Sequence, residues 1–204
     1  MTASIPVPER EREPRADARR NRERVIKAAR WCMAHDGLDA QMEEIARRAK
    51  VGVGTVYRHF KTKDDLVDAL AAERFERLRD LANEALAKDD AWDAFEGFMR
   101  ASARIQTDDR ALSEVLTSRP DTMGRAAEAV DILGLVGQIL ERAQAAGVVR
   151  EDARAHDVPM IMCALAGTFR NPHADPDRYI GITLDGLRPR GATELTELPD
   201  VALG

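Results

Sequence analysis

Apolar residues recur every three or four positions through most of this 204-residue chain, and no other feature limits its fold as strongly. This spacing places apolar side chains along one face of an α-helix, whereas a half-buried β-strand alternates apolar and polar residues. The sequence lacks such alternation, and glycine or proline separates the periodic segments. We therefore predict an all-α protein, with helices at about 17–36, 41–49, 53–60, from Lys63 onward, 91–106, 109–117, 122–146, 154–169 and 175–187.

Composition narrows the class of protein. The chain is 44% apolar and 33% charged, as in ordinary globular proteins. It has no stretch of roughly 18 apolar residues and no apolar segment near its start, so we expect a cytoplasmic protein without a membrane span or signal peptide. Cys32 and Cys163 are far apart, and His156 and His173 have no partner at ligand spacing, so we expect neither a metal nor another cofactor.

The net charge of −5 is divided unevenly along the chain. Residues 1–63 carry 15 basic and 9 acidic residues, a balance of +6, whereas the remainder carries 16 and 27, a balance of −11. A basic head joined to an acidic body is typical of a module that binds a polyanion. The first residues alternate arginine with glutamate, so this tail alone does not distinguish DNA binding from a solvated surface.

Residues 41–60 have the pattern of a helix-turn-helix, in which Lys50-Val51-Gly52 joins two short helices. Val51 and Val56 are placed to fill the space between these helices, which leaves outside Thr55, Tyr57, Arg58 and His59. Tyrosine and histidine donate hydrogen bonds to phosphate oxygens, and arginine reaches a phosphate or a guanine edge. An ordinary exposed helix has similar patterning, so both interpretations stay open at this point.

The segment "MEEIARRAKVGVGTVYRHFKTKDDLVDAL", residues 42–70, resembles the signature of the TetR/AcrR family of regulators. Its G-T-x-Y-x-H-F-x-x-K core directly follows an I-A-x-x-A-x-V segment, and the likeness covers roughly residues 17–70. The resemblance implies a three-helix DNA-binding head and a larger helical body for regulation and dimerisation. We place a disordered arm at 1–15, the head at 16–62, the body at 63–188 and a disordered tail at 189–204.

The resemblance also implies a mechanism. Two chains pair through their last two long helices and bind an inverted-repeat DNA operator. An effector in the body moves the fourth helix, changes the separation of the two heads and releases the operator. We therefore expect a homodimeric repressor whose partners are double-stranded DNA and a small, mainly apolar molecule.

The family's DNA-contacting positions carry over to named residues of this chain. Those resembling the phosphate-clamping set are Thr55, Tyr57, His59 and Lys63, and those where members touch bases or backbone are Gln41, Met42, Glu43, Val53, Gly54 and Arg58. Gln41 and Met42 replace the usual capping threonine or serine, although Asp39 can cap if the helix begins at Ala40. Lys50 replaces a common glycine, which costs about 1 kcal/mol if that position is left-handed.

Two further sets of residues are predicted in the body. The candidate effector pocket comprises Trp92, Phe95, Phe98, Met99, Met123 and Val136, because they bring aromatic and apolar side chains together on two helices. For each of them, a place in the plain core is the alternative. The candidate dimer interface comprises Val136, Ile139, Leu165 and Phe169.

Two other functions have to be weighed against an effector-controlled regulator. An enzyme needs a nucleophile or an acid/base pair in a cleft, and the sequence has no G-x-S-x-G, Walker, H-E-x-x-H or Rossmann motif. A DNA-binding protein without an effector is the other alternative. A body too tightly packed to hold a ligand would favour it.

Overall fold

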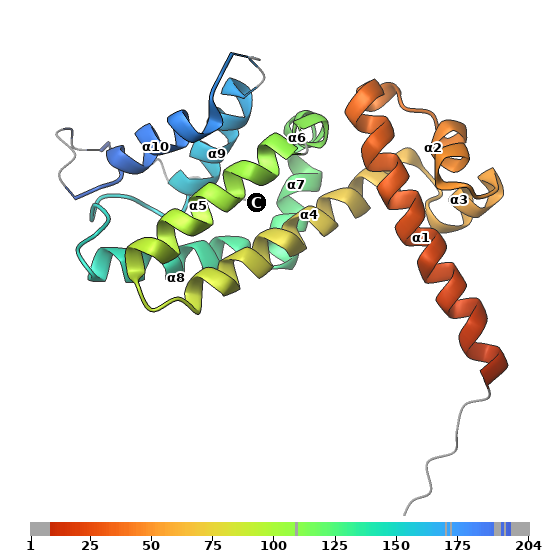
Figure 1. Cartoon of the computed structure of the whole chain (residues 1–204), viewed down its shortest axis with the longest axis horizontal. Coiled ribbons are helices and arrows are strands. Elements are labelled where there is room, and N and C mark those ends of the chain that lie inside the picture. Colours follow the sequence, from red (N-terminus) through yellow and green to blue (C-terminus); the bar gives the residue numbers. More distant parts are fainter. Residues whose placement is uncertain are drawn as a thin grey trace, which may run out of the picture.

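The computed structural model describes residues 9–108, 110–169, 171, 173–189, 193, 195 and 196. A head contains α1 (Glu9–Asp36), the short helix η1 (Gly37–Asp39), α2 (Met42–Ala49) and α3 (Val53–His59). α4 (Lys63–Leu86) runs from the head into a body made of α5 (Ala91–Asp108), α6 (Arg110–Thr117), α7 (Pro120–Ala129), α8 (Ile132–Ala145), α9 (Asp157–Thr168) and α10 (Pro176–Gly186) (Figure 1). The predicted all-α fold is confirmed.

The first helix begins earlier than the sequence analysis predicted. α1 starts at Glu9 instead of residue 17, so the prediction of a disordered arm is wrong for residues 9–15. Arginine and glutamate occupy every position of this segment except Pro14, and both are strong helix formers. Residues 1–8 lie outside the described part of the chain.

The predicted helix at 122–146 is divided into α7 and α8. Asp131 interrupts it with a left-handed backbone, at φ 48°, and its carboxylate accepts a hydrogen bond from the Gly134 N–H at 3.3 Å. Aspartate tolerates this conformation better than most residues and caps helix starts well. The polar side chain at position 131 therefore begins a helix where the apolar spacing alone predicts an interior position.

The core of the head is built from the apolar stripes of its three helices. Val25, Ala29 and Met33 of α1 pack with Ile45 of α2 and Val56 of α3, and all five are buried. Val51 is half-buried against the same core, so the predicted filling of the helix-turn-helix by Val51 and Val56 is confirmed.

Lys50 ends α2 in the left-handed conformation, at φ 54° and ψ 46°. The Val51 N–H then closes the helix by donating to the Ala46 carbonyl at 3.1 Å. Arg24 of α1 donates to the Lys50 carbonyl at 3.1 Å and ties the turn to the first helix. A lysine with a β-carbon therefore occupies a position where glycine carries no steric cost.

α4 begins with a reciprocal capping box. The Asp65 N–H donates to the Thr62 hydroxyl at 3.0 Å, and the Thr62 N–H donates to the Asp65 carboxylate at 2.9 Å. This arrangement satisfies two donors that a helix start otherwise leaves unpaired. It fixes the helix axis directly after the recognition helix α3.

Two hydrophobic cores share α4. Its first half, from Leu66 to Phe75, is buried with the head and with Leu112, Val115 and Leu116 of α6. Its second half contributes Ala82 and Ala85 to a separate core with α5, α8, α9 and α10. The head is therefore continuous with α6, although α6 is a body helix by its place in the sequence.

The buried Arg74 lies on α4 next to Phe75, within the stretch that packs in the first core. Its guanidinium donates to the Ser113 hydroxyl of α6 at 2.9 Å and to the Gln106 side-chain oxygen of α5. Such charge-assisted hydrogen bonds offset part of the cost of burying a cation. They also fix the relative positions of three helices at one point.

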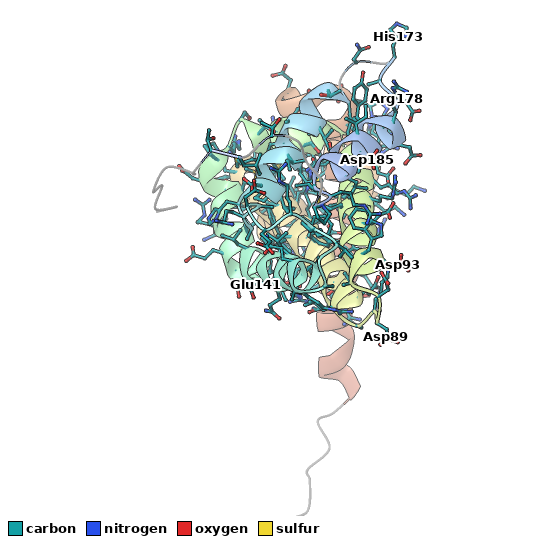
Figure 2. All side chains as sticks on the ribbon, turned by 90° about the vertical axis from the view of Figure 1, so that its left-hand side faces the viewer. Asp89, Asp93, Glu141, His173, Arg178 and Asp185 are labelled. Atoms are coloured by element: carbon teal, nitrogen blue, oxygen red, sulfur yellow. The ribbon has the colours of Figure 1, made fainter. Side chains whose placement is uncertain are left out.

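Arginines also hold the far end of the body. Arg142 of α8 donates to the carbonyls of Leu86, Lys88 and Asp89, and so closes the C-terminal end of α4. Figure 2 looks onto this end, where Asp89, Asp93, Glu141 and Asp185 lie. These four acidic side chains share that end of the body with Arg178 and His173.

Part of the predicted disordered tail is anchored to the body. Arg150 donates to the Thr193 carbonyl at 2.5 Å, and the Leu195 N–H donates to the Asp152 carboxylate at 3.0 Å. The hydrogen-bonded Arg150 guanidinium holds the pKa of Asp152 far below its usual range. Most other residues of 189–204 lie outside the described part of the chain.

Replacing Lys50 with glycine should stabilise the head. Removing the β-carbon from a left-handed position is expected to raise the free energy of unfolding by about 1 kcal/mol. Urea denaturation followed by circular dichroism measures this change, and Lys50→Ala is the matched control because it removes the charge but keeps the strain. Equal stability of the glycine and alanine variants would contradict the prediction.

Candidate nucleic-acid interface

The exposed surface of α3 is the most prominent feature of the head. Val56 is the buried residue of this helix, because α3 is short and touches the rest of the head along one narrow stripe. Its other large side chains face outward: Val53 is 42% exposed and Tyr57 is 44% exposed. Gly54 and Arg58 are exposed as well. The ring of Tyr57 and the guanidinium of Arg58 are therefore exposed to solvent. The start of the same helix, at Val53 and Gly54, carries little side-chain bulk.

The four residues of the predicted phosphate clamp lie around the end of α3. Thr55 and His59 are half-buried and one helical turn apart, whereas Tyr57 is exposed. His59 packs against Phe60, whose ring centroid is 6.3 Å away and whose side chain belongs to the head core. Lys63 follows as the first residue of α4. The four residues thus fall on one short stretch that the α3–α4 turn holds in place.

The starts of α2 and α3 carry no side-chain cap. Gln41 and Gly52 occupy the two N-cap positions, and neither accepts a hydrogen bond from its helix through a side chain. Asp39 is not the cap, because α2 begins at Met42; instead, the Gln41 amide donates to the Asp39 carbonyl at 2.7 Å. Backbone N–H groups at uncapped helix starts bind anions well, phosphate included.

The side chain of Met42 lies in the head core, so any contact of this residue with DNA is through its backbone. Met42 is 7% exposed and packs in the head core with Ile45, Ala46 and Ala49 of the same helix. The spacing of these four residues makes one apolar stripe. Gln41 and Glu43 on either side of Met42 are exposed.

The cationic side chains around α2 and α3 differ in their surroundings. Arg47 hydrogen-bonds Glu44 at 2.5 and 2.8 Å, and this guanidinium lowers the pKa of the Glu44 carboxyl. Lys50 and Lys61 are exposed at the two ends of α3. Neither was in the predicted set, although a count of cations flanking the recognition helix in the sequence would have found both.

The predicted effector residues do not form one cavity wall. Phe95, Phe98, Met99 and Val136 are buried in the body core, as the core alternative requires. Met123 packs against the other core, the one that includes the head. Trp92 is half-buried, with Arg188 stacked 3.2 Å from its ring centroid and its N–H donating to Glu96.

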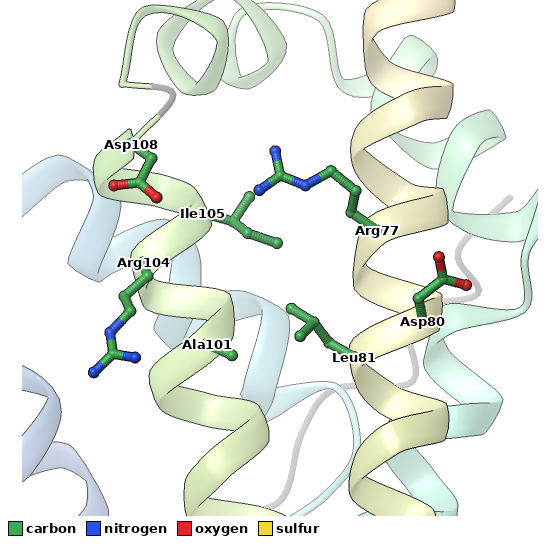
Figure 3. Close-up of a pocket in the computed structure, with 7 residues that line it drawn as sticks. All are labelled: Arg77, Asp80, Leu81, Ala101, Arg104, Ile105 and Asp108. Atoms are coloured by element: carbon green, nitrogen blue, oxygen red, sulfur yellow. The ribbon is translucent and has the colours of Figure 1, made fainter.

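A groove of about 300 Å³ lies instead on another face of α5, between it and α4 (Figure 3). Leu81 of α4 and Ile105 of α5 point toward one another across it, with Ala101 beside them. Arg77 also extends from α4 toward α5. The remaining lining residues are Asp80, Arg104 and Asp108, so apolar side chains are combined with charges of both signs.

The predicted dimer contacts are buried within the single chain. Val136, Ile139, Leu165 and Phe169 all belong to the body core of the single chain, where each is at most 7% exposed. The exposed apolar side chains of α9 and α10 are different ones, Met160 at 61%, Ile182 at 57% and Tyr179 at 39% exposure. α9 and α10 thus carry exposed apolar side chains on the faces that point away from the body core.

Two further findings concern other classes of site. Within the described residues, no group of three or more histidine, cysteine, aspartate or glutamate side chains is arranged to hold a metal ion. Among the helices in that same part of the chain, none has the length and apolar character to cross a membrane. Cys32 is buried, and this burial raises the pKa of its thiol.

The fold and this surface define a class of protein: helix-turn-helix regulators in which a small DNA-binding head is joined to a larger helical body. The chain matches the model of bacterial regulatory proteins of the tetR family at residues 25–70. It also matches the C-terminal domain of SbtR-like transcriptional regulators at residues 90–189. The chain belongs to the TetR family of transcriptional regulators, a family of transcription factors and not of enzymes.

Solved structures of similar proteins agree with this assignment. A TetR regulator of Mycobacterium vanbaalenii is 38% identical, with 85% of this chain and 98% of that chain covered and a TM-score of 0.63. A TetR regulator of Streptomyces coelicolor is 31% identical over 83% of this chain and 99% of that one, also with a TM-score of 0.63.

Two further similarities show less about this chain, one because its identity is low and the other because it covers few residues. FadR of Bacillus subtilis, solved in complex with stearoyl-CoA, is 18% identical, covers 84% of this chain and 99% of its own, and has a TM-score of 0.69, which shows a likeness of fold alone. An HTH-type transcriptional regulator of Staphylococcus aureus is 42% identical over 53 residues, which are 26% of this chain and 29% of that protein.

Substitutions on α3 should separate residues that bind phosphate from one that reads a base. Tyr57→Phe and Lys63→Ala are expected to weaken binding to operator and random DNA alike, and Lys63→Ala should lower the salt slope by about 1. Arg58→Ala should instead reduce the preference for one base pair, by about 1–3 kcal/mol if Arg58 binds guanine. Fluorescence anisotropy over a salt series measures both effects.

The matched control removes a cation from the body, where Lys88 is exposed. Lys88→Ala should leave the affinity for both DNAs nearly unchanged. If Arg58→Ala weakened binding to operator and random DNA equally, Arg58 would belong to the phosphate-binding residues and not to the base readers.

Proposed function

We propose that this chain is an effector-responsive, sequence-specific repressor that binds an inverted-repeat operator as a homodimer. The observation that carries the proposal is the exposed recognition helix α3, with Tyr57 and Arg58 in solvent and Lys63 following it. Family membership adds the regulatory role, and the head's core extends through α4 and α6 into the body. A DNA-binding surface is thus mechanically joined to a second domain.

The apolar character of α9 supports a dimer, because both its core-facing side and its exposed side carry apolar residues. Val158, Met162 and Leu165 face the body core, whereas Met160, Ala164 and Gly167 are exposed. A helix that is apolar all around is normally buried on all sides. We therefore place the dimer interface on the outward faces of α9 and α10, around Met160 and Ile182, instead of on the residues first predicted.

The symmetry of such a dimer determines the form of the operator. Two recognition helices enter successive major grooves of one DNA face about 34–36 Å apart, so the two half-sites form an inverted repeat. The uncapped starts of α2 and α3 supply backbone N–H groups for the phosphates at each half-site. Repression follows if the bound dimer covers promoter DNA.

The described contacts supply a route by which the body can displace the head. Asp64 on the first turn of α4 pairs with Arg119, which precedes α7, at 2.6 Å. One turn later Asp68 accepts hydrogen bonds from Thr122 at 2.8 Å and from Arg125 at 3.2 Å. These contacts hold α7 against the first turns of α4, directly after Lys63. A shift of α4 relative to α7 would therefore move the head.

We place the effector in the groove between α4 and α5. Leu81, Ala101 and Ile105 provide apolar contacts, and Arg77 provides a cation for a polar end of the ligand. This combination suits a small molecule that is mainly apolar with one polar or anionic end. FadR, a protein of this fold, was solved with stearoyl-CoA, whose acyl chain is apolar.

The dimer has one arrangement that binds DNA and another that does not. To release the operator, the effector must have the higher affinity for the arrangement that does not bind DNA. By linkage, operator DNA then weakens effector binding by the same factor. A wedge between α4 and α5 would act on the hydrogen bonds of Arg74, which join these helices to α6.

One observation favours a second candidate, a DNA-binding protein without an effector. Phe95, Phe98 and Met99 of α5 are packed in the body core, and the groove lies beside this core without entering it. A solidly packed body of this kind could serve dimerisation alone. Ligand titration distinguishes the two candidates, because the second predicts no small molecule that changes operator affinity.

Selection of bound fragments from the source genome, followed by footprinting, tests the proposed function. We expect enriched fragments to share an inverted repeat and the footprint to cover both half-sites. Protection of a single asymmetric half-site by a monomer would contradict the proposal. The genes next to the enriched sites would then narrow the chemical class of the effector.

Charges on the outward faces of α9 and α10 should break the dimer. Ile182→Glu combined with Met160→Glu is expected to yield a folded monomer, because both side chains are exposed in the single chain. Analytical ultracentrifugation measures the association, and operator affinity should fall with it. Ala145→Glu, at an exposed position on α8, is the control. An unchanged dimer in the double variant would place the interface elsewhere.

Filling the groove should abolish induction without affecting operator binding. Ala101→Trp adds bulk at a half-exposed position of the groove, whereas Met99→Trp would disrupt the core because Met99 is fully buried. Operator affinity is measured with and without an effector found by ligand screening. Ala145→Trp is the matched control on a surface away from the groove. Full induction in Ala101→Trp would exclude the groove as the effector site.

A further inference from the structure

α1 is much longer than the packing of the head requires. Its 28 residues extend about 42 Å at 1.5 Å per residue. From residue 16 on, where the burial of α1 is described, the buried residues begin at Val25, and none of residues 16–24 is buried. Figure 1 shows this first half of α1 projecting past α2 and α3. Residues 16–24 therefore gain little stability from the head core, and the length of the helix calls for another explanation.

The extension leaves the head beside both ends of the recognition helix. The Arg22 guanidinium lies 5.4 Å from the ring centroid of Phe60, which directly follows α3. Arg24 donates to the carbonyl of Lys50, in the turn that precedes α3. α1 thus passes α3 at residues 22–24, and the preceding turns, from Glu9 on, continue about 20 Å farther.

The side chains change character where α1 leaves the head. Ile26, Ala29 and Met33 are buried and lie three or four residues apart along one stripe. The same spacing toward the N-terminus reaches Arg22 and Arg19, both exposed. In the sequence it continues through Arg15 and Arg12. A stripe that is apolar inside the head is therefore replaced by arginine outside it.

Arg19 and Arg22 are exposed and can approach an anion. Arg19 has Glu23 as a neighbour at 3.6 Å, but both side chains are highly exposed, at 79% and 65%. Exposed ion pairs of this kind contribute little and exchange readily. Arg22 lies over the ring of Phe60, which stands between His59 and Lys61 of the candidate interface in the sequence. A guanidinium in such surroundings suits a phosphate oxygen.

We propose that the N-terminal turns of α1 form a second DNA-binding element, which lies along the sugar-phosphate backbone flanking each half-site. Arg22 binds a phosphate next to the α3 footprint, and Arg19 binds one farther out. The contact is independent of base sequence, because phosphates carry no sequence information directly. This inference rests on the proposed DNA-binding function and adds a second element to the recognition helix.

The test combines protein variants with operators of different length. Arg19→Gln with Arg22→Gln removes two cations per chain, and the salt slope should fall by about 0.9 for each phosphate that is no longer neutralised. Arg20→Gln with Lys27→Gln removes the same charge from another side of α1 and should change the slope less. Thermal unfolding checks that each variant is folded, and Arg19→Gln alone leaves the contact of Arg22 with Phe60 intact.

The second comparison is between the full operator and an operator from which the DNA flanking the inverted repeat has been removed. The unsubstituted protein and the Arg20/Lys27 variant should lose several-fold affinity on the trimmed operator, whereas the Arg19/Arg22 variant should lose almost none. Equal losses in all three proteins, or equal salt slopes in the two variants, would overturn the inference while leaving operator binding intact. If the unsubstituted protein binds no operator of either length, the proposed function itself fails.

Discussion

The packing of α4 in two hydrophobic cores is the constraint on which the rest of the molecule depends. Its first half is buried with the head and α6, and its second half is buried with the body helices. Arg74, beside Phe75, adds hydrogen bonds to α5 and α6. Because close-packed cores resist continuous deformation, we expect a displacement of one half of α4 to move the other half with it.

The head is held by two kinds of contact that respond differently to conditions. Apolar side chains of α6 join the core under α1, and this packing does not depend on charge. By contrast, Arg119 with Asp64 and Arg125 with Asp68 are ion pairs at the surface, which salt screens. The two ion pairs are therefore expected to weaken at high salt, whereas the apolar contacts are not.

The burial pattern of the recognition helix could be predicted because its determinants are local. Val56 is buried and Tyr57 and Arg58 are exposed, as the short helical pattern predicts, and Lys50 has the left-handed backbone under which a glycine would carry no steric cost. Met42 is the exception, since its position in the motif and its place in an apolar stripe favour different environments. Burial prevailed because a methionine side chain gains more from a core than from solvent.

The sequence by itself determined the helical class, the order of the helices and the head, since helical periodicity and turn chemistry act over a few residues. Only the tertiary structure decided which face of each body helix is buried. Phe98, Leu165 and Val136 are core residues, and the groove and the exposed apolar surface lie on other faces. A helix that is apolar on several sides, such as α9, offers more than one face for burial. The neighbours that choose among them come from distant parts of the chain.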